Sequence, residues 1–323
     1  MFNNILCLVL AFSSASALAA SNCKLVRIAE WEVKPQNNRL IVNGEINGQK
    51  VGILIDSGAA TSFVLRAAAD RLGLVRQEAK GYRAFGVGGE THVEFAVIDE
   101  LKIGTATRKN WRAMVLGEHD QGTRYSFLLG YDFMDQVDVE FDLANNAIRI
   151  FRPQDCDEVS LAYWAKGGAS VVTLETDNAR PGILLPVRLN GQPIVANLDT
   201  GAPRSIVSRL IAANLGIGPE NAKAAGTSGG LGPARSERYI GSFETFAIGD
   251  ELIRNPNIAF ANLEVSAAAT GSRLSVTREL RDMLLGVDFL RAHRVFVAHS
   301  QGKAYFTYAG GSVFSAPPKP AAK

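Results

Sequence analysis

The chain has 323 residues, of which 47% are hydrophobic and 20% are charged, and its formal net charge is +2 at pH 7. Length and composition together favour a soluble globular protein of two ordinary domains with ample core. The near-neutral charge, without any cluster of Lys and Arg, excludes the basic surface that nucleic-acid binding requires.

The first 19 residues have the pattern of a signal peptide. The apolar core at 5–12 is too short to span a bilayer, and Ala17-Leu18-Ala19 is a small-x-small cleavage site, although no Lys or Arg precedes the core. No later hydrophobic segment approaches the 18 residues of a membrane span, so we expect no stable membrane insertion. The mature chain is therefore expected to be exported, to the periplasm or the medium; a buried N-terminal strand is the alternative.

Two cysteines remain after Cys7 leaves with the signal peptide, namely Cys23 and Cys156. An even pair in an oxidising compartment predicts a disulfide that brackets the first half of the chain. Two free thiols are the alternative. We expect no zinc site, because no pair of His residues accompanies the two cysteines.

Two segments of the chain repeat the same order of elements, 143 residues apart. In the first, an Asn-Gly hairpin turn at 47–48 leads into an apolar strand at 51–55, which runs directly into Asp56-Ser57-Gly58. The second copy has the same turn at 190–191, a strand at 194–198 and Asp199-Thr200-Gly201. Each half therefore presents one Asp at the end of an equivalent strand.

The repeat continues beyond the Asp motifs. Short helices are predicted at 66–72 and 209–215, with Gly73 and Gly216 placed to end them in the left-handed conformation. Leu128-Leu129-Gly130 recurs as Leu284-Leu285-Gly286, 156 residues later, so the second half holds about 13 residues more than the first. We divide the mature chain into lobes at 20–162 and 163–315, joined near 153–168, and expect the Pro/Ala-rich tail at 316–323 to be disordered.

The doubled pattern is more specific than its parts, because Asp-Ser/Thr-Gly alone is a turn motif. Both copies have the apolar strand, a following Ala and the apolar-apolar-Gly motif, and together these resemble the retropepsin-like aspartic peptidases, fused as two lobes over residues 39–308. The resemblance implies two mostly β lobes with a few short helices and an active site at their interface. It also implies a monomer without cofactor or metal that acts on protein or peptide substrates.

By this resemblance Asp56 and Asp199 are the catalytic pair. Two carboxylates about 3 Å apart cannot both ionise and so share one proton. One can then act as general base on a water molecule and the other as general acid on the peptide carbonyl. Four neighbouring residues are expected to support the pair. The hydroxyls of Ser57 and Thr200 would reach across to the opposite loop, and Gly58 and Gly201 would let the two loops approach because they have no Cβ.

The residue three positions after each Asp bears on the working pH. The pepsin branch commonly carries a hydroxyl there that stabilises the ionised carboxylate, whereas this chain has Ala59 and Ala202, as in retroviral enzymes. Without that donor the apparent pKa values of the pair rise. We expect an activity optimum at roughly pH 4–6.5 rather than near pH 2.

Two glycine-rich stretches, at 86–89 and 226–232, occupy the place of flaps in this family. Such hairpins hold a substrate that binds as an extended strand. Plain surface loops are the alternative. The residues expected at the flaps or against substrate are Tyr82, Phe85, Gly86, Gly88, Gly89, Ser228, Gly229 and Gly230.

The remaining motifs do not indicate a second catalytic site or a metal site. The match of 226–230 to the Gly-x-Ser-x-Gly motif lacks the following helix that a nucleophile elbow needs, and the four histidines have no ligand spacing. Asp132 and Asp288 also repeat, and we interpret them as structural residues.

An inactive copy of the fold that binds peptides or serves as an adaptor is the main alternative function. A decayed copy would usually lose one Asp motif, and this chain keeps both. A self-processing zymogen is disfavoured, because the stretch at 21–39 is short for an inhibitory pro-segment.

Overall fold

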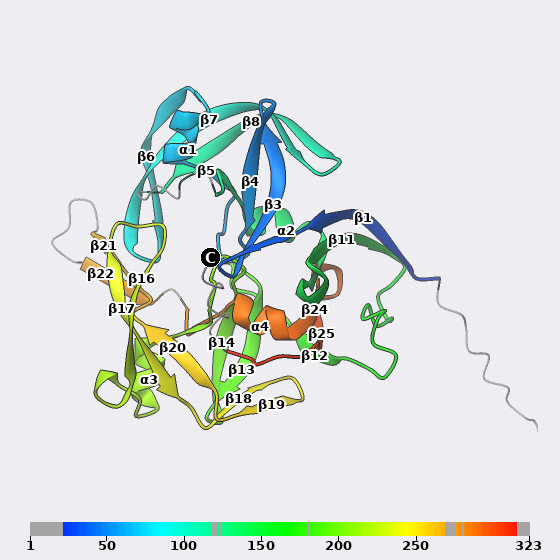
Figure 1. The fold of residues 1–323 in the computed structure, drawn as a ribbon, viewed down its shortest axis with the longest axis vertical. Helices are drawn as coiled ribbons and strands as arrows, with labels where there is room; N and C mark the ends of the chain where they lie inside the picture. Colours follow the sequence, from blue (N-terminus) through cyan, green and yellow to red (C-terminus); the bar gives the residue numbers. More distant parts are fainter. Residues whose placement is uncertain are drawn as a thin grey trace, which may run out of the picture.

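The structure, a computed structural model, describes residues 22–117, 122, 124–179, 181–268, 275–279 and 281–314. Within these residues the chain is mostly β-strand with four short α-helices, which confirms the predicted fold class. Figure 1 shows two lobes, one above the other, and a third sheet beside them that receives strands from both. The predicted signal peptide at 1–19 and tail at 316–323 lie outside the described residues.

The first lobe is built on an eight-stranded sheet, in blue to green at the top of Figure 1. Its strands are β2 (Lys34–Gln36), β3 (Arg39–Ile46), β4 (Gln49–Ile55), β5 (Phe63–Leu65), β6 (Arg76–Gly86), β7 (Gly89–Ile103), β8 (Ala106–Leu116) and β9 (Phe127–Leu129). They lie in the order β2-β3-β4-β9-β5-β8-β7-β6. β4 and β9 run parallel, so the strand that ends before Asp56 lies beside the strand that ends before Gly130.

The second lobe repeats this plan in a nine-stranded sheet. Its strands are β13 (Leu184–Leu189), β14 (Gln192–Leu198), β15 (Ile206–Ser208), β16 (Lys223–Gly229), β17 (Arg235–Ser242), β18 (Thr245–Ile248), β19 (Glu251–Arg254), β20 (Asn257–Ala261) and β23 (Met283–Leu285). β14 pairs in parallel with β23 as β4 does with β9. The same pairing at the two Asp strands shows that the sequence repeat is also a repeat of topology.

Most of the extra residues of the second half form a hairpin, β21 (Glu264–Ala268) with β22 (Ser275–Glu279), that has no counterpart among the described residues of the first lobe. Strand register shows where the extra residues are inserted. Val64 pairs with Val115 in the first lobe, and Val207 pairs with Phe260 in the second. Equivalent residues of the two halves are therefore 145 positions apart at these strands (260 − 115). The offset is 156 at the Leu-Leu-Gly motifs, so 11 residues are added between the two points. β21 lies against β6 and β7 of the first lobe.

The helices are short and follow the strands that carry the repeated motifs. They are α1 (Arg66–Arg71), α2 (Tyr131–Met134), α3 (Arg209–Asn214) and α4 (Val287–Ala292), with 3₁₀ turns at Leu143–Asn145, Pro219–Asn221 and His299–Gln301. The helices predicted at 66–72 and 209–215 each end one residue early. Gly73 and Gly216 follow with φ of +67° and +74°, as the left-handed helix end requires.

The third sheet joins the lobes through backbone pairing. It has the order β1-β11-β10-β24-β25-β12, three strands from each half of the chain. At its centre β10 pairs with β24, for example Val139 with Val297. The six strands are β1 (Lys24–Glu32), β10 (Asp138–Asp142), β11 (Ala147–Gln154), β12 (Ser170–Thr173), β24 (His293–Ala298) and β25 (Lys303–Tyr308).

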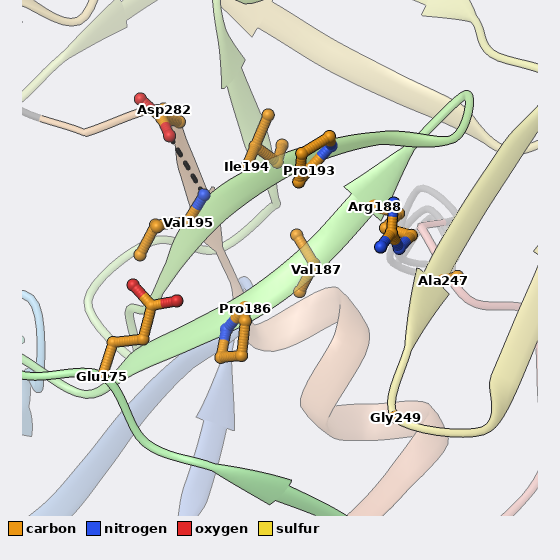
Figure 2. A pocket seen from close by; sticks show the side chains of 10 residues that line it. All are labelled: Glu175, Pro186, Val187, Arg188, Pro193, Ile194, Val195, Ala247, Gly249 and Asp282. Atoms are coloured by element: carbon orange, nitrogen blue, oxygen red, sulfur yellow. Dashed lines mark hydrogen bonds between the residues drawn. The ribbon is translucent and has the colours of Figure 1, made fainter.

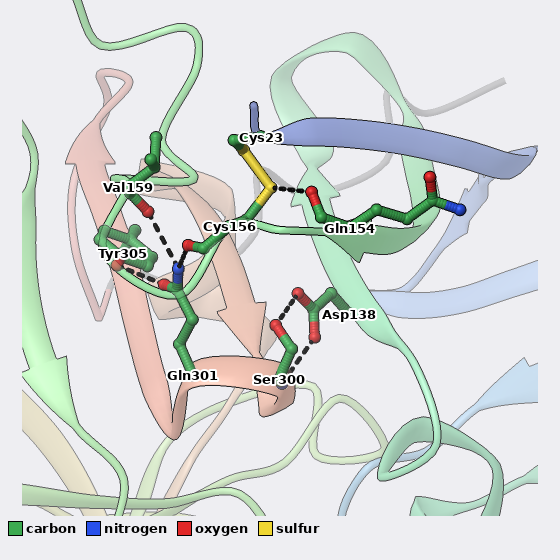
Figure 3. The surroundings of a disulfide bond; sticks show 8 residues. All are labelled: Cys23, Asp138, Gln154, Cys156, Val159, Ser300, Gln301 and Tyr305. Atoms are coloured by element: carbon green, nitrogen blue, oxygen red, sulfur yellow. Dashed lines mark hydrogen bonds between the residues drawn. A yellow bond between two sulfur atoms is a disulfide. The ribbon is translucent and has the colours of Figure 1, made fainter. Parts of the chain in front are cut away.

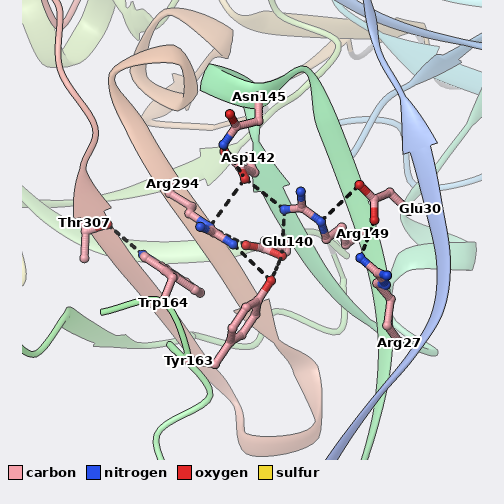
Figure 4. A network of polar contacts seen from close by, with 10 residues as sticks. All are labelled: Arg27, Glu30, Glu140, Asp142, Asn145, Arg149, Tyr163, Trp164, Arg294 and Thr307. Carbon is pink, nitrogen blue, oxygen red and sulfur yellow. Dashed lines mark hydrogen bonds and ion pairs between the residues drawn. The ribbon is translucent and has the colours of Figure 1, made fainter. Parts of the chain in front are cut away.

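A charged network at the centre of this sheet ties the halves together (Figure 4). The side chain of Glu140 on β10 is fully buried and accepts hydrogen bonds from Arg294 of β24 and from the Tyr163 hydroxyl, the latter at 2.7 Å. Arg149 of β11 donates to Asp142 at 2.9 Å. A buried carboxylate is tolerated only with such donors around it, so the network favours one register of β10 on β24.

The predicted disulfide between Cys23 and Cys156 is confirmed (Figure 3). It joins the chain before β1 to the chain after β11 across 133 residues. Gln301 of the second half donates to the Cys156 carbonyl oxygen at 2.5 Å, and Ser300 N–H donates to Asp138 at 2.9 Å. The end of the first lobe is therefore fastened to the second lobe as well as to its own beginning.

We expect removal of this disulfide by Cys23→Ser and Cys156→Ser together to lower the free energy of unfolding by about 2–5 kcal/mol, because a long loop of the unfolded chain is no longer closed. Urea unfolding of the variant and of the wild type, each with and without reductant, measures the difference. Two titratable thiols in the denatured, unreduced wild type would contradict the pairing.

Candidate active site

Two buried apolar strands hold the Asp motifs at the interface of the lobes. Ile55, at the end of β4, and Leu198, at the end of β14, are 1% and 0% exposed. Burial of each such side chain contributes about 1.5–3 kcal/mol, which fixes the strand ends. The next N–H groups bond to the Leu-Leu-Gly strands, Asp56 N to Leu129 O and Asp199 N to Leu285 O, both at 2.9 Å.

Ser57 and Thr200 connect the two Asp loops through four hydrogen bonds. The Ser57 hydroxyl donates to the Leu198 carbonyl oxygen at 2.5 Å, and the Thr200 hydroxyl donates to the Ile55 carbonyl oxygen at 2.8 Å. Each hydroxyl also accepts the N–H of the other residue, at 2.9 and 3.0 Å. Both side chains are completely buried, so this reciprocal set fixes the position of one loop on the other.

The two carboxyl groups are held in the same way in both lobes. Oδ1 of Asp56 accepts the N–H groups of Gly58 and Ala59, both at 3.1 Å. Oδ1 of Asp199 accepts those of Gly201 and Ala202 at 2.9 and 3.0 Å. The two carboxyl groups lie close together, because each lies against the glycine of the opposite loop and the charge of Asp56 acts on Asp199. One oxygen of each group is thus occupied by backbone donors.

The absence of a Cβ at Gly58 and Gly201 makes this approach possible. A Cβ on Gly58 would lie 2.4 Å from Cγ of Asp199, and a Cβ on Gly201 would lie 2.3 Å from Cγ of Asp56. Both distances are far below van der Waals contact. Each glycine therefore gives room to the carboxyl group of the opposite lobe.

The pKa values of both carboxyl groups are raised. Burial, followed by the repulsion of the neighbouring Asp56, raises the pKa of Asp199 to about 7, against the backbone N–H groups that favour its ionised form. Burial also raises the pKa of Asp56, opposed by its own N–H donors and by the charge of Arg39. Asp199 is 8% exposed and Asp56 is partly exposed, so the pair is not completely shielded from solvent.

The second pair of repeated acids supports the Asp loops from behind. Asp132 accepts the N–H and the hydroxyl of Ser62 at 2.9 and 2.6 Å, and Asp288 accepts those of Ser205 at 2.8 and 2.6 Å. The serine hydroxyls in turn accept the N–H groups of Gly130 and Gly286. These contacts give both acids the structural part expected of them.

The two glycine-rich stretches form hairpin tips that contact each other. The β6–β7 hairpin of the first lobe meets the loop between β16 and β17 of the second, through Gly232 N to Val87 O at 3.1 Å and Ala234 N to Gly88 O at 2.9 Å. A Cβ on Gly230 would lie 2.8 Å from Val87. The tips therefore close over one another, a contact that the sequence did not predict.

The other residues expected at the flaps lie within the two hairpins, at varying distances along the chain from their tips. Gly86 and Gly89 pair at the end of the first hairpin, and the backbone of Ser228 pairs with Ser236 in the second, next to Gly229. Tyr82 packs edge-on against Phe95, with ring centroids 5.5 Å apart. Phe85 lies opposite Glu90 and so projects away from the face of the buried Thr91.

The comparison with known proteins follows the two lobes. The aspartyl protease family model matches the chain twice, over residues 42–133 and 185–289. The chain belongs to the aspartyl protease family. One match falls in each lobe and contains one Asp motif, which confirms the predicted resemblance to two-lobed, retropepsin-like members. No curated protein matches the chain.

Other features of the chain lie apart from the Asp pair. A pocket of about 330 Å³ in the second lobe is lined mainly by β13 and β14 (Figure 2). Asp282 also lines it and accepts the N–H of Val195, and no residue of the Asp loops is among the lining residues. Among the described residues, no group of three His, Cys, Asp or Glu side chains could hold a metal ion. No helix of the described chain has the length and hydropathy needed to cross a membrane.

Sequence reasoning missed Arg39, which acts on the Asp pair, and two arginines of the second lobe. Arg39, at the start of β3, has a charge that acts on both Asp side chains, and its guanidinium lies 5.8 Å from the ring centroid of Tyr125. Arg204 and Arg238 lie on the second-lobe side. Comparison of the two repeats position by position could have identified the last two, since the first lobe has neutral residues there.

Proposed function

We propose that the protein is an exported, monomeric aspartic endopeptidase that hydrolyses peptide bonds with water activated by Asp56 and Asp199. The observation that carries this proposal is the close approach of two carboxyl groups, one from each lobe, each packed on the glycine of the opposite loop and held by two backbone N–H groups. A single chain supplies both halves of the pair, so no second copy is required.

The pair holds one proton, because burial and mutual repulsion make double ionisation costly. The ionised carboxylate takes a proton from water while the water oxygen attacks the carbonyl carbon of the peptide. The protonated carboxyl gives its proton to the carbonyl oxygen. The tetrahedral intermediate then breaks its C–N bond as the leaving amine is protonated, without a covalent enzyme intermediate.

The paired hairpin tips suit a substrate bound as an extended strand. Their backbone N–H and C=O groups, now bonded to each other, can turn to a peptide once it lies between the tips and the Asp pair. Entry of the substrate then requires the two bonds between the tips to open.

Export is supported by the N-terminal pattern and by the disulfide. Structural disulfides form and persist in oxidising compartments, and Cys23 lies close behind the expected cleavage site. The periplasm and the medium both fit this chemistry.

Digestion of a proteome-derived peptide library by the mature chain tests the proposal. We expect cleavage that a statine-type transition-state mimic inhibits and that chelators and serine-directed reagents leave unchanged. An Asp199→Asn protein, prepared in parallel, controls for contaminating peptidases. Binding of peptides without any turnover would instead identify an inactive peptide-binding module.

The pH dependence of cleavage should form a bell with its optimum at roughly pH 4–6.5. Activity falls as the pair loses its last proton, near the pKa of Asp199 at about 7, and falls again when the pair gains a second proton. A hydroxyl donor stabilises the ionised form, so Ala59→Ser with Ala202→Ser should move both limbs to lower pH. A pH–rate profile on a substrate without titrating groups measures this. A wild-type optimum below about pH 3, or unmoved limbs in the variant, would refute it.

A further inference from the structure

Two arginines of the second lobe, Arg204 and Arg238, form no ion pair with any acid among the described residues. Arg238 donates from Nη2 to the Ala225 carbonyl oxygen at 2.8 Å, but its buried Nε–H has no acceptor within the described residues. In the same part of the chain, Arg204 forms neither a hydrogen bond nor an ion pair. A buried N–H group is normally paired in proteins, so the Nε–H of Arg238 and the partly exposed guanidinium group of Arg204 are available to a ligand.

Strand register places the Arg238 side chain on the face of the sheet that looks toward the second Asp loop. Arg238 lies directly opposite Ala261 in the antiparallel pair of β17 and β20, and directly opposed side chains project from the same face. Ala261 belongs to an apolar cluster that contains Ala202, and Val87 of the first hairpin tip packs on that cluster. Arg238 is therefore directed into the space between the Asp loop and the flap tips.

Arg204 lies five residues after Asp199 and is half-buried. Burial lowers the pKa of Arg238, and the positive charge of Arg204 lowers it further. The charge of Arg204 also acts on Asp288, but that carboxyl group is already engaged by the N–H and hydroxyl of Ser205. A carboxylate placed between the two arginines would relieve their repulsion and could accept paired hydrogen bonds.

The first lobe has no such cations at the equivalent positions. Glu94 pairs with Val115 in the first lobe, and Tyr239 pairs with the equivalent Phe260 in the second. The residues just before them, Val93 and Arg238, therefore occupy equivalent positions. Thr61 corresponds to Arg204 by the 143-residue offset of the Asp loops. Val93 is buried and apolar. The pair of charges is therefore present on one side of the cleft alone.

We propose that Arg204 and Arg238 form a subsite that binds an acidic side chain, Asp or Glu, of the peptide substrate. The inference rests on the proposed peptidase function. It further states that the acidic preference falls on one side of the cleaved bond, because the first lobe offers Thr61 and Val93 instead.

Peptides recovered from the library digest, aligned on the cleaved bond, should show Asp or Glu enriched at one position. The best sequence is then synthesised with Glu, Gln or Lys at that position. We expect kcat/KM for the Glu peptide to exceed that for the Gln peptide by roughly ten-fold or more, the effect of a charge-assisted hydrogen bond. Arg204→Gln with Arg238→Gln should reduce the ratio to about two-fold or less, and Arg204→Glu should shift the preference toward Lys.

Arg209→Gln is the matched control, because Arg209 lies over the ring of Tyr239, whose side chain alternates to the other face of β17. This variant should keep the wild-type ratio. Cleavage of the Glu and Gln peptides at equal rates by the wild type would overturn the subsite and leave the peptidase function standing. Absence of any cleavage would overturn the function instead, and calorimetric titration of the Asp199→Asn protein with the same two peptides would then decide the subsite by itself.

Discussion

Asp56→Asn or Asp199→Asn alone should reduce peptide cleavage by roughly 10³-fold or more, while the fold persists. Each lobe contributes half of one acid–base pair, and an amide can neither accept the proton of water nor exchange a proton with the remaining carboxyl. The backbone N–H groups around each Oδ1 can still bond to the amide oxygen, so the loops keep their positions. Single-turnover and steady-state assays on the best library peptide measure the loss.

Stability provides the control for this pair of variants. A carboxyl whose pKa is raised in the folded state makes folding less favourable as pH rises from the unfolded value toward the folded one. Since the pKa of Asp199 is raised to about 7, Asp199→Asn should melt at or above the wild-type temperature at pH 7. Asp99→Asn, on the exposed surface of β7, should leave activity unchanged. Retention of a tenth of wild-type turnover in either dyad variant would exclude the assignment.

The second large effect is expected from Gly201→Ala, which should lower kcat/KM by roughly 10²-fold. The new methyl group would lie 2.3 Å from Cγ of Asp56, so either the loop or the carboxyl group must move. The four bonds of Ser57 and Thr200 oppose movement of the loop. The displacement therefore falls on the Asp pair, where about 1 Å of misplacement is enough to impair catalysis.

Gly58→Ala should behave in the same way, because its Cβ would lie 2.4 Å from Cγ of Asp199. Gly167→Ala is the control, since no atom lies within 4 Å of its added methyl group. Kinetics and thermal unfolding of the three variants separate a local effect at the Asp pair from general destabilisation. Unchanged kcat/KM in Gly201→Ala would show that the carboxyl groups do not require this close approach.

The duplication, the two Asp motifs, the short helices after them and the disulfide pair could all be predicted from the sequence. These features are local or repeated. An apolar strand that runs into Asp-Ser/Thr-Gly has the same physical consequence in both halves, a buried strand that ends at an interface, so two copies predicted two equivalent loops. The helix-ending glycines Gly73 and Gly216 were predictable because a positive φ is a property of the residue itself.

The way the two halves meet could not be predicted from local patterns. The pairing of β10 with β24 and the bonds between the hairpin tips join residues that are distant in the sequence. No local pattern encodes which strand edge meets which, because register depends on the packing of both lobes at once. Phe85 is a second example. Its place beside the hairpin tip could be predicted, but the face of the sheet from which its side chain projects depends on the pairing of β6 with β7.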